Sequence, residues 1–142
     1  MSRRSQGTVV RSFEAEVEQT FGPLATELAL EAGREPARVP GVQCVAYRSR
    51  PLAYRVCLSL EDHGVFTAVH LSTGERTLVS YLEELVPAAG LGARQDVPTS
   101  AHTLHAVRRS LSAQADWVRR LHPIIAGPEG TALLERAGAR RW

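Results

Sequence analysis

Alternation of apolar and polar residues is clearest in the middle of the chain. Three runs rich in β-branched and aromatic residues, 42–48, 53–60 and 65–71, are separated by short segments that contain turn-forming residues. Runs of this kind between turns are typical of β-strands. Because the connections are long enough only for hairpins, the pattern predicts a three-stranded antiparallel meander.

The two turns set the expected strand register. Pro51 cannot donate to a strand ladder and belongs in the first turn, while Gly64 can close the second turn with a positive φ. The first hairpin then places Tyr47 opposite Tyr54 and Cys44 opposite Cys57. With Asp62 and His63 at the centre of the second turn, the expected pairs are Tyr54 with Leu71, Val56 with Val69, Leu58 with Thr67 and Arg55 with His70.

Side chains alternate between the two faces of a strand, and both turns gather the large apolar residues on one face. We predict that this face is the core and that it contains Val45, Tyr47, Tyr54, Val56, Leu58, Leu60, Val65, Val69 and Leu71. The opposite face is mixed and is expected to contact solvent or a partner. It contains Cys44, Ala46, Arg55, Cys57, Ser59, Phe66, Ala68 and His70.

Helical periodicity appears on both sides of the meander. Before it, an apolar stripe predicts a helix from about Ser12 to Gly33, interrupted at Gly22-Pro23, with residues 1–9 as a flexible tail and 34–41 as a connector. After it, Ser80 and Glu83 have the spacing of a capping box, which predicts a helix to about residue 89, with Tyr81 packed inward. A long helix is expected from Thr99 or Ser100 to about His122, and a short one over 131–137.

These elements predict one α+β domain over residues 1–142. The expected order is α-β-β-β-α-α-α, with the helices packed on one face of the sheet. An exposed outer strand could also pair with a second copy of the chain, so a homo-oligomer is an open alternative.

Composition limits the classes of protein that remain. Apolar residues make up 44% and charged residues 23% of the 142 residues, as in ordinary globular proteins. The formal net charge of +2 is too small to require nucleic acid or an anionic membrane. No apolar stretch approaches a membrane span and the N-terminus lacks a signal-peptide core, so we expect a cytoplasmic protein with reduced cysteines. The predicted opposition of Cys44 and Cys57 leaves a bridge open as an alternative, provided that the ladder geometry suits it.

All 17 basic residues are arginines. Codons for Arg, Ala and Gly are rich in G and C, so this bias indicates a GC-rich bacterial genome more readily than a special need for guanidinium groups.

Catalytic and metal-binding signatures are missing from the sequence. No phosphate-binding loop, dinucleotide glycine pattern, nucleophile elbow or zinc-protease motif occurs. His102 and His105 could share a helix face, but a metal site needs more ligands than these two. We therefore predict no catalytic residue, no cofactor and no metal.

Two groups of residues are candidates for binding a partner. The mixed sheet face offers Arg55, Phe66 and His70. The long helix offers Arg108-Arg109 and Arg119-Arg120, which are separated by about three helical turns and are expected to form a stripe on one side.

The segments Tyr81-Leu82-Glu83-Glu84-Leu85, after the third strand, and Pro123-Ile124-Ile125-Ala126-Gly127, near the end of the long helix, complete a recognisable layout. Over residues 42–127 this layout resembles small bacterial immunity proteins of polymorphic toxin systems. The resemblance implies binding and blocking of a cognate toxin without catalysis. It concerns the order of elements, so it carries over no functional residue.

The leading hypothesis is therefore a non-catalytic, cytoplasmic protein-binding module, with a toxin-neutralising immunity protein as its specific form. One alternative is a nucleic-acid-binding accessory protein that uses the arginine-bearing helix, although the modest charge and Asp116 between the arginine pairs disfavour it. Another is a small ligand-binding domain or enzyme on the polar sheet face, using Arg55 and His70.

Overall fold

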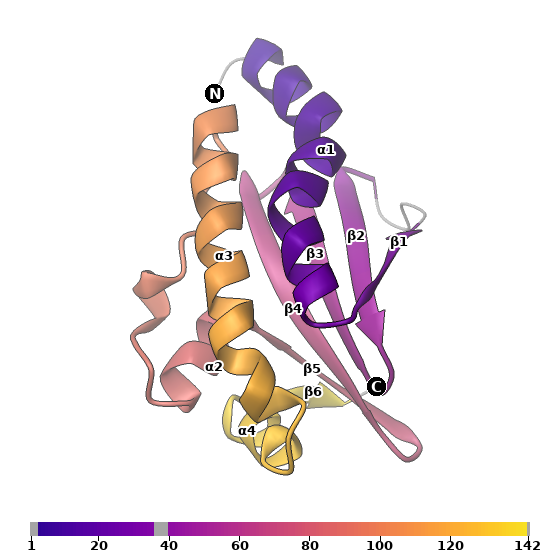
Figure 1. Ribbon diagram of the computed structural model, residues 1–142. Coiled ribbons are helices and arrows are strands. Elements are labelled where there is room, and N and C mark those ends of the chain that lie inside the picture. Colours follow the sequence, from indigo (N-terminus) through magenta and orange to yellow (C-terminus); the bar gives the residue numbers. More distant parts are fainter. Residues whose placement is uncertain (1–2, 36–39, 142) are drawn as a thin grey trace.

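A computed structural model of the chain describes residues 3–35 and 40–141 (Figure 1). It contains four α-helices, a short 3₁₀ helix and six strands. In chain order these are α1 (Arg3–Glu27), β1 (Glu31–Glu35), β2 (Val42–Ser49), β3 (Leu52–Ser59), β4 (Gly64–Thr73), β5 (Arg76–Tyr81), α2 (Leu82–Ala88), η1 (Arg94–Asp96), α3 (Leu104–Ile125), α4 (Gly130–Arg136) and β6 (Arg140–Arg141).

The strands form one antiparallel sheet in which every strand pairs with the next one along the chain, in the order β1-β2-β3-β4-β5-β6. The predicted meander is its centre, β2 to β4, so the α+β class is confirmed and the count of three strands is wrong. The sequence of β1, EAGRE, has no β-branched or aromatic residue, and β6 has only two residues. Such strands depend on a neighbouring edge for their hydrogen bonds rather than on their own propensity.

The predicted register is right in the first hairpin and wrong in the second. Cys44 pairs with Cys57 as expected, but Leu52 rather than Tyr54 pairs with Leu71. The second turn takes up four residues, 60–63, and the backbone of His63 adopts a φ of 48°. A shift of two residues leaves every side chain on its predicted face, because alternation has a period of two. The predicted core residues of β2–β4 are accordingly buried, with Leu60 in the turn only partly so.

Helix α1 starts earlier and ends earlier than predicted. It begins at Arg3, so residues 3–9 are helical rather than a tail, and Val9 is buried at 1% exposure. The helix continues through Pro23 because its apolar stripe, including Phe21 and Leu24, stays in the core on both sides of the proline. It ends at Glu27. Within the predicted connector 34–41, residues 34 and 35 belong to β1 and residues 36–39 lie outside the described residues.

The capping box expected at Ser80 does not form. Ser80 lies in β5 at 2% exposure, its hydroxyl has no hydrogen-bond partner among the described residues, and Tyr81 rather than Ser80 precedes α2. The sheet takes this serine because Val69 of β4 pairs with it. The predicted end of this helix near Gly90 is confirmed by Ala89 as its C-cap.

Helix α3 begins at Leu104, a few residues later than predicted. Thr103 caps it, with its Oγ1 accepting a hydrogen bond from the Ala106 amide at 3.1 Å. The predicted start, Thr99-Ser100, instead adds to the sheet: the Val65 amide donates to the Thr99 carbonyl at 2.8 Å, and the Ala101 amide donates to the His63 carbonyl at 2.8 Å. The helix continues through Pro123 and ends at Ile125.

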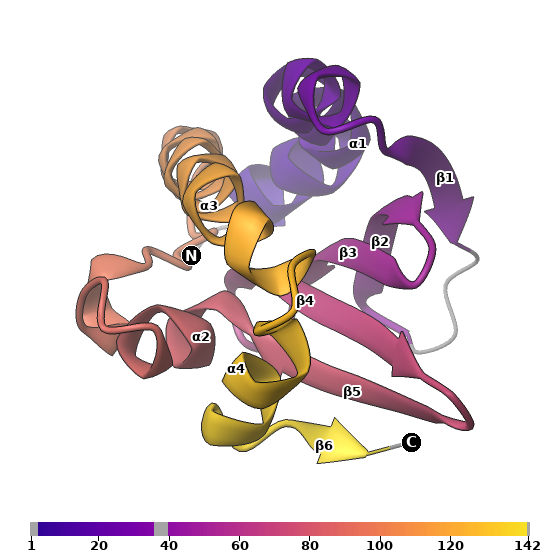
Figure 2. The same cartoon turned by 60° about the horizontal axis from the view of Figure 1, so that its bottom comes forward.

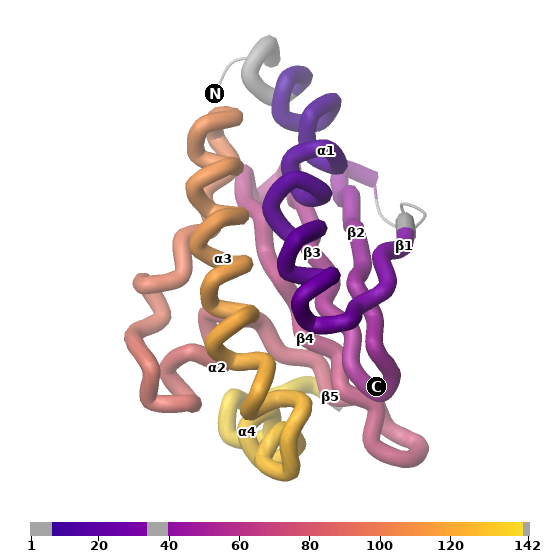
Figure 3. Tube along the Cα trace, viewed as in Figure 1, coloured from indigo at the N-terminus to yellow at the C-terminus, as the bar shows by residue number. Residues whose placement is uncertain are grey.

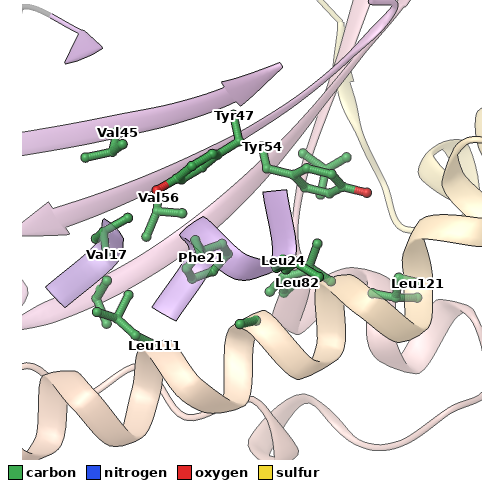
Figure 4. Close-up of a cluster of buried hydrophobic side chains, with 14 of the residues drawn as sticks. Val17, Phe21, Leu24, Val45, Tyr47, Tyr54, Val56, Leu82, Leu111 and Leu121 are labelled. Atoms are coloured by element: carbon green, nitrogen blue, oxygen red, sulfur yellow. The ribbon is translucent and has the colours of Figure 1, made fainter. Parts of the chain in front are cut away.

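The helices cover one face of the sheet (Figure 2). The tube in Figure 3 shows that α1 and α3 run side by side in the same direction across this face. The core lies between these helices and the strands, where Phe21, Leu24, Leu111 and Leu121 meet Tyr54 and other side chains of the sheet (Figure 4). The predicted packing of the helices on one sheet face is confirmed.

Candidate binding site on the uncovered sheet face

The face of the sheet that points away from the helices is here called the uncovered face. It contains the side chains of Cys44, Ala46, Ala53, Arg55, Cys57, Ser59, Phe66, Ala68, His70, Val79 and Tyr81. Along β3, buried residues alternate with partly exposed ones, and the partly exposed ones belong to this face. No helix of the described chain shields it in Figure 2.

Small residues form the floor of the uncovered face. Ala46 and Ala68 are the register partners of Arg55 on either side, and they are 0% and 5% exposed. Alanines on a solvent-facing side can be this buried only because larger neighbouring side chains lie over them. Tyr81 is the partner of Ala68 on the other strand. The strand register therefore places Arg55 and Tyr81 on either side of Ala68.

Two aromatic rings stand together toward one end of this face. Phe66 and Tyr81 have ring centroids 6.4 Å apart and an interplanar angle of 79°, an edge-to-face contact. Among the described residues, Tyr81 is the large hydrophobic residue whose side chain is exposed, at 38%. The prediction that Tyr81 packs inward is therefore wrong, because it is the last residue of β5 and its position in the sheet directs it away from the helices.

Beside these rings lies a hollow of about 690 Å³, here called the aromatic hollow. It occupies the place where β5 leaves β4 to become α2 and where residues 99–101 arrive to pair with the start of β4. Its walls come from Asp62, Phe66, Tyr81, Glu83, Glu84, Arg94, Gln95, Val97, Thr99 and Arg140.

Glu83 is the deepest charged group of the aromatic hollow, with only 9% exposure. Burial raises the pKa of its carboxyl group, and the nearby Glu84 raises it further, while Arg94 and the Glu83 amide act in the opposite direction. Among the side chains that the structure describes, none forms an ion pair or a hydrogen bond with this carboxylate. A carboxylate held largely out of water with no ion pair, and with its own amide as hydrogen-bond donor, is costly for the fold, and such groups gather at functional sites.

A second cavity, of about 330 Å³, lies at the opposite end of β3, beside the turn that contains the cis peptide bond Arg50-Pro51. His122 lies in its wall, and its Nδ1 shares a hydrogen bond of 2.7 Å with the hydroxyl of the buried Tyr54. Burial lowers the pKa of His122, so this histidine is neutral near pH 7. The other polar lining residues are Arg50 and hydroxyl side chains, without a carboxylate.

The histidines noted in the sequence do not form a metal site in the described part of the chain. His102 stacks on His63, with ring centroids 4.9 Å apart, so it is paired with the β3–β4 turn rather than with His105. No group of three or more His, Cys, Asp or Glu side chains among the described residues is placed to hold a metal ion.

Cys44 and Cys57, predicted to be reduced, form a disulfide between β2 and β3, and both lie on the uncovered face. Their predicted opposition in the first hairpin brings the Cα atoms to 4.1 Å, which allows this bond. Reduced cysteines were predicted because a cytoplasmic location was predicted. The strand register by itself places the two cysteines opposite each other.

The predicted arginine stripe on α3 divides into two sides. Arg108 pairs with Glu16 at 2.9 Å, and Arg119 pairs with Glu27 at 3.1 Å and with Asp116 at 3.1 Å. These contacts raise the pKa of both guanidinium groups, first through the hydrogen bonds to Glu16 and Glu27. Because neighbouring helix positions differ by about 100°, the other pair faces elsewhere.

On that other side, Arg120 lies over the ring of Trp117 at 4.4 Å, and Arg109 is exposed. The four arginines therefore do not form one free cationic surface, because α1 has occupied two of them.

The structure places Arg55, Phe66 and His70 on the same face, as the alternation predicts. His70 pairs with Ala53 and Arg55 pairs with Ala68, so the two are not direct cross-strand partners. Sequence reasoning missed Tyr81, Glu83, Glu84 and Arg94 as wall residues. The apparent capping box concealed them, because it assigned Ser80–Glu83 to a helix start.

No protein-family model matches the chain, and neither the search of curated proteins nor the search of solved structures found a match. None of the helices in the described residues is both long and apolar enough to cross a membrane. The site must therefore be interpreted from its own geometry.

Proposed function

We propose that this protein is a binding module for another protein and that the uncovered face is its binding surface. The observation that supports the proposal is the one-sided placement of the helices, which leaves Phe66 and Tyr81 in the wall of a hollow on the opposite face, the face to which Arg55 also belongs. Aromatic residues and arginine are enriched at the centres of protein interfaces, where they supply most of the binding energy. A rigid sheet that presents such side chains is preorganised for association.

A toxin-neutralising immunity protein is the specific form of this proposal. The layout of the sequence supports it, and so does the absence of a recognisable catalytic motif. Such a protein would block its target by occupying a surface. The Cys44–Cys57 disulfide favours an oxidising compartment over the cytoplasm that the sequence predicts.

A small-ligand-binding role is the second candidate. The volume of the aromatic hollow, about 690 Å³, lies within the range of known ligand sites. A nucleic-acid-binding role for α3 has less support, because Arg108 and Arg119 already pair with carboxylates of α1.

The test first captures host proteins that bind the chain. The complex is then rebuilt from the purified proteins, and the affinities of two variants are compared with that of the wild type. Tyr81→Ser removes the exposed ring from the uncovered face, while Arg109→Ser changes an exposed residue on α3. We expect the first variant to weaken the complex by at least about tenfold, as loss of an interface aromatic does, and the second to leave it unchanged.

The reverse pattern, with Arg109→Ser weakening the complex and Tyr81→Ser having no effect, would show that α3 is the binding surface. Capture of nucleic acid that is released by salt would favour the nucleic-acid alternative.

A further inference from the structure

We infer that the aromatic hollow receives a cationic side chain, arginine or lysine, from the partner protein, with Glu83 as its counter-ion. The inference rests on the proposed function and adds the chemistry of the partner. It starts from the contrast between the 9% exposure of Glu83 and the lack of an ion pair to its carboxylate among the described side chains, where its own amide is the hydrogen-bond donor.

Charge supports a cation rather than an anion. The hollow contains the carboxylates of Asp62, Glu83 and Glu84 and the guanidinium groups of Arg94 and Arg140. Of the acids, Glu83 is the buried one, while Asp62 is exposed and already accepts a hydrogen bond from Ser59 at 2.9 Å. An anion entering the hollow would increase the cost of ionising Glu83, whereas a cation would offset it.

The rings support an organic cation attached to an apolar stem. Phe66 and Tyr81 both line the hollow and contact each other edge to face. Aromatic faces attract guanidinium and ammonium groups, and the methylene groups of arginine or lysine can lie against the rings. Carboxylate and ring together match such a side chain better than they match a hydrated metal ion.

The site also predicts how binding depends on pH. A cation stabilises the ionised form of Glu83, so binding should release the proton that burial helps to retain. Binding should therefore weaken as pH falls through the Glu83 pKa, which burial has raised. The other groups that face Glu83 are Glu84, which acts in the same direction, and Arg94, which opposes it.

The experiment uses Nα-acetyl-arginine amide as the cation and the corresponding citrulline amide as a neutral analogue of the same shape. Titration is followed by NMR at the Phe66 and Tyr81 rings and at the Glu83 carboxyl carbon. We expect the arginine probe to bind about tenfold more tightly than the citrulline probe, the difference that one charge-assisted hydrogen bond makes. Glu83→Gln should abolish the difference.

Glu75→Gln is the matched control, because it removes an exposed carboxylate in the β4–β5 turn outside the hollow. It should leave the preference for arginine intact. Equal binding of both probes, or equal loss in both variants, would overturn the inference.

Two further outcomes separate this inference from the proposed function. If the probes show no preference but Tyr81→Ser still disrupts the partner complex, the cation assignment fails and the proposed function stands. If the arginine probe binds but Tyr81→Ser leaves the complex intact, the hollow is no partner site and both fail. A wild-type dimer that Glu83→Gln dissociates would make a second copy the occupant and would also overturn the inference.

Discussion

Gln114 and Glu83 are both buried polar residues beside β4, and their surroundings differ. Gln114, at 0% exposure, donates from Nε2 to the carbonyls of Val65 and Pro98 at 2.9 and 2.8 Å, and its Oε1 accepts from the Thr67 hydroxyl at 2.7 Å. Glu83, at 9% exposure, has no side-chain partner among the described residues.

The difference separates a structural role from the binding role that we propose. Gln114 connects α3 to β4 and to the loop before Ala101, and each of its polar atoms is satisfied inside the fold. A buried group satisfied in this way stabilises one arrangement of the core. Glu83 lines the aromatic hollow instead, where burial raises its pKa and makes its charged form costly for the folded state.

The largest effect should come from Gln114→Leu. The substitution leaves the Val65 and Pro98 carbonyls and the Thr67 hydroxyl without their buried partner, so the free energy of unfolding should fall by about 3 kcal/mol. Urea denaturation measures the change. Adding Thr67→Val should restore part of the loss, because it removes one of the stranded polar groups. If Gln114→Leu leaves stability unchanged, the structural role assigned to this glutamine is wrong.

Glu83→Gln should act in the opposite direction and should depend on pH. Burial raises the pKa of Glu83 in the folded protein, so ionisation costs the folded state more than the unfolded state. The variant should therefore match the wild type at pH 3, where both states are protonated. It should become more stable than the wild type as pH rises above the ordinary glutamate pKa of about 4.3. Thermal melts at both pH values test this, and a destabilised variant at pH 7 would contradict it.

Tyr47→Phe tests a buried polar group of the core that, unlike Gln114, has no hydrogen-bond partner among the described residues. The Tyr47 hydroxyl is buried without a hydrogen-bond partner among the described residues, while its ring stacks on Phe21 with centroids 5.9 Å apart. Removing only the hydroxyl should raise the free energy of unfolding by about 1 kcal/mol, because a stranded polar group disappears. The same burial raises the pKa of Tyr47 to about 12. A less stable variant would show that the hydroxyl has a partner after all.

The smallest effects should come from the arginines of α3. Arg108→Ala breaks the ion pair with Glu16, in which the arginine side chain is 59% exposed and the Glu16 side chain 10% exposed. Solvent at the arginine limits the loss of stability, but the buried Glu16 loses its partner, so the loss should be measurable. Arg109→Ala should have no measurable effect. Thermal melts at low and high salt compare the two, since salt should remove the difference between them. If Arg109→Ala lowers stability more than Arg108→Ala does, the two arginines do not lie on different sides of α3 as described.

The sequence by itself determined which side chains belong to which face of the central strands. Alternation has a period of two, so the assignment of Val56 to the core and Arg55 to the opposite face survived a two-residue error in the second register. It also determined the α+β class and the end of α2 near Gly90, because these depend on local residue types and on a glycine with φ of 71°.

Only the tertiary structure decided the strands at the sheet edges and the composition of the site. Strand β1 pairs because β2 offers it a free edge, and Ser80 joins β5 because Val69 lies opposite. The same pairing turns Tyr81 outward and places Glu83 and Phe66 in the wall of one hollow. Likewise, α1 occupies Arg108 and Arg119 because the two helices run in parallel. Local patterns record the preferences of a segment, whereas these contacts depend on hydrogen bonds and charges supplied by segments distant in sequence.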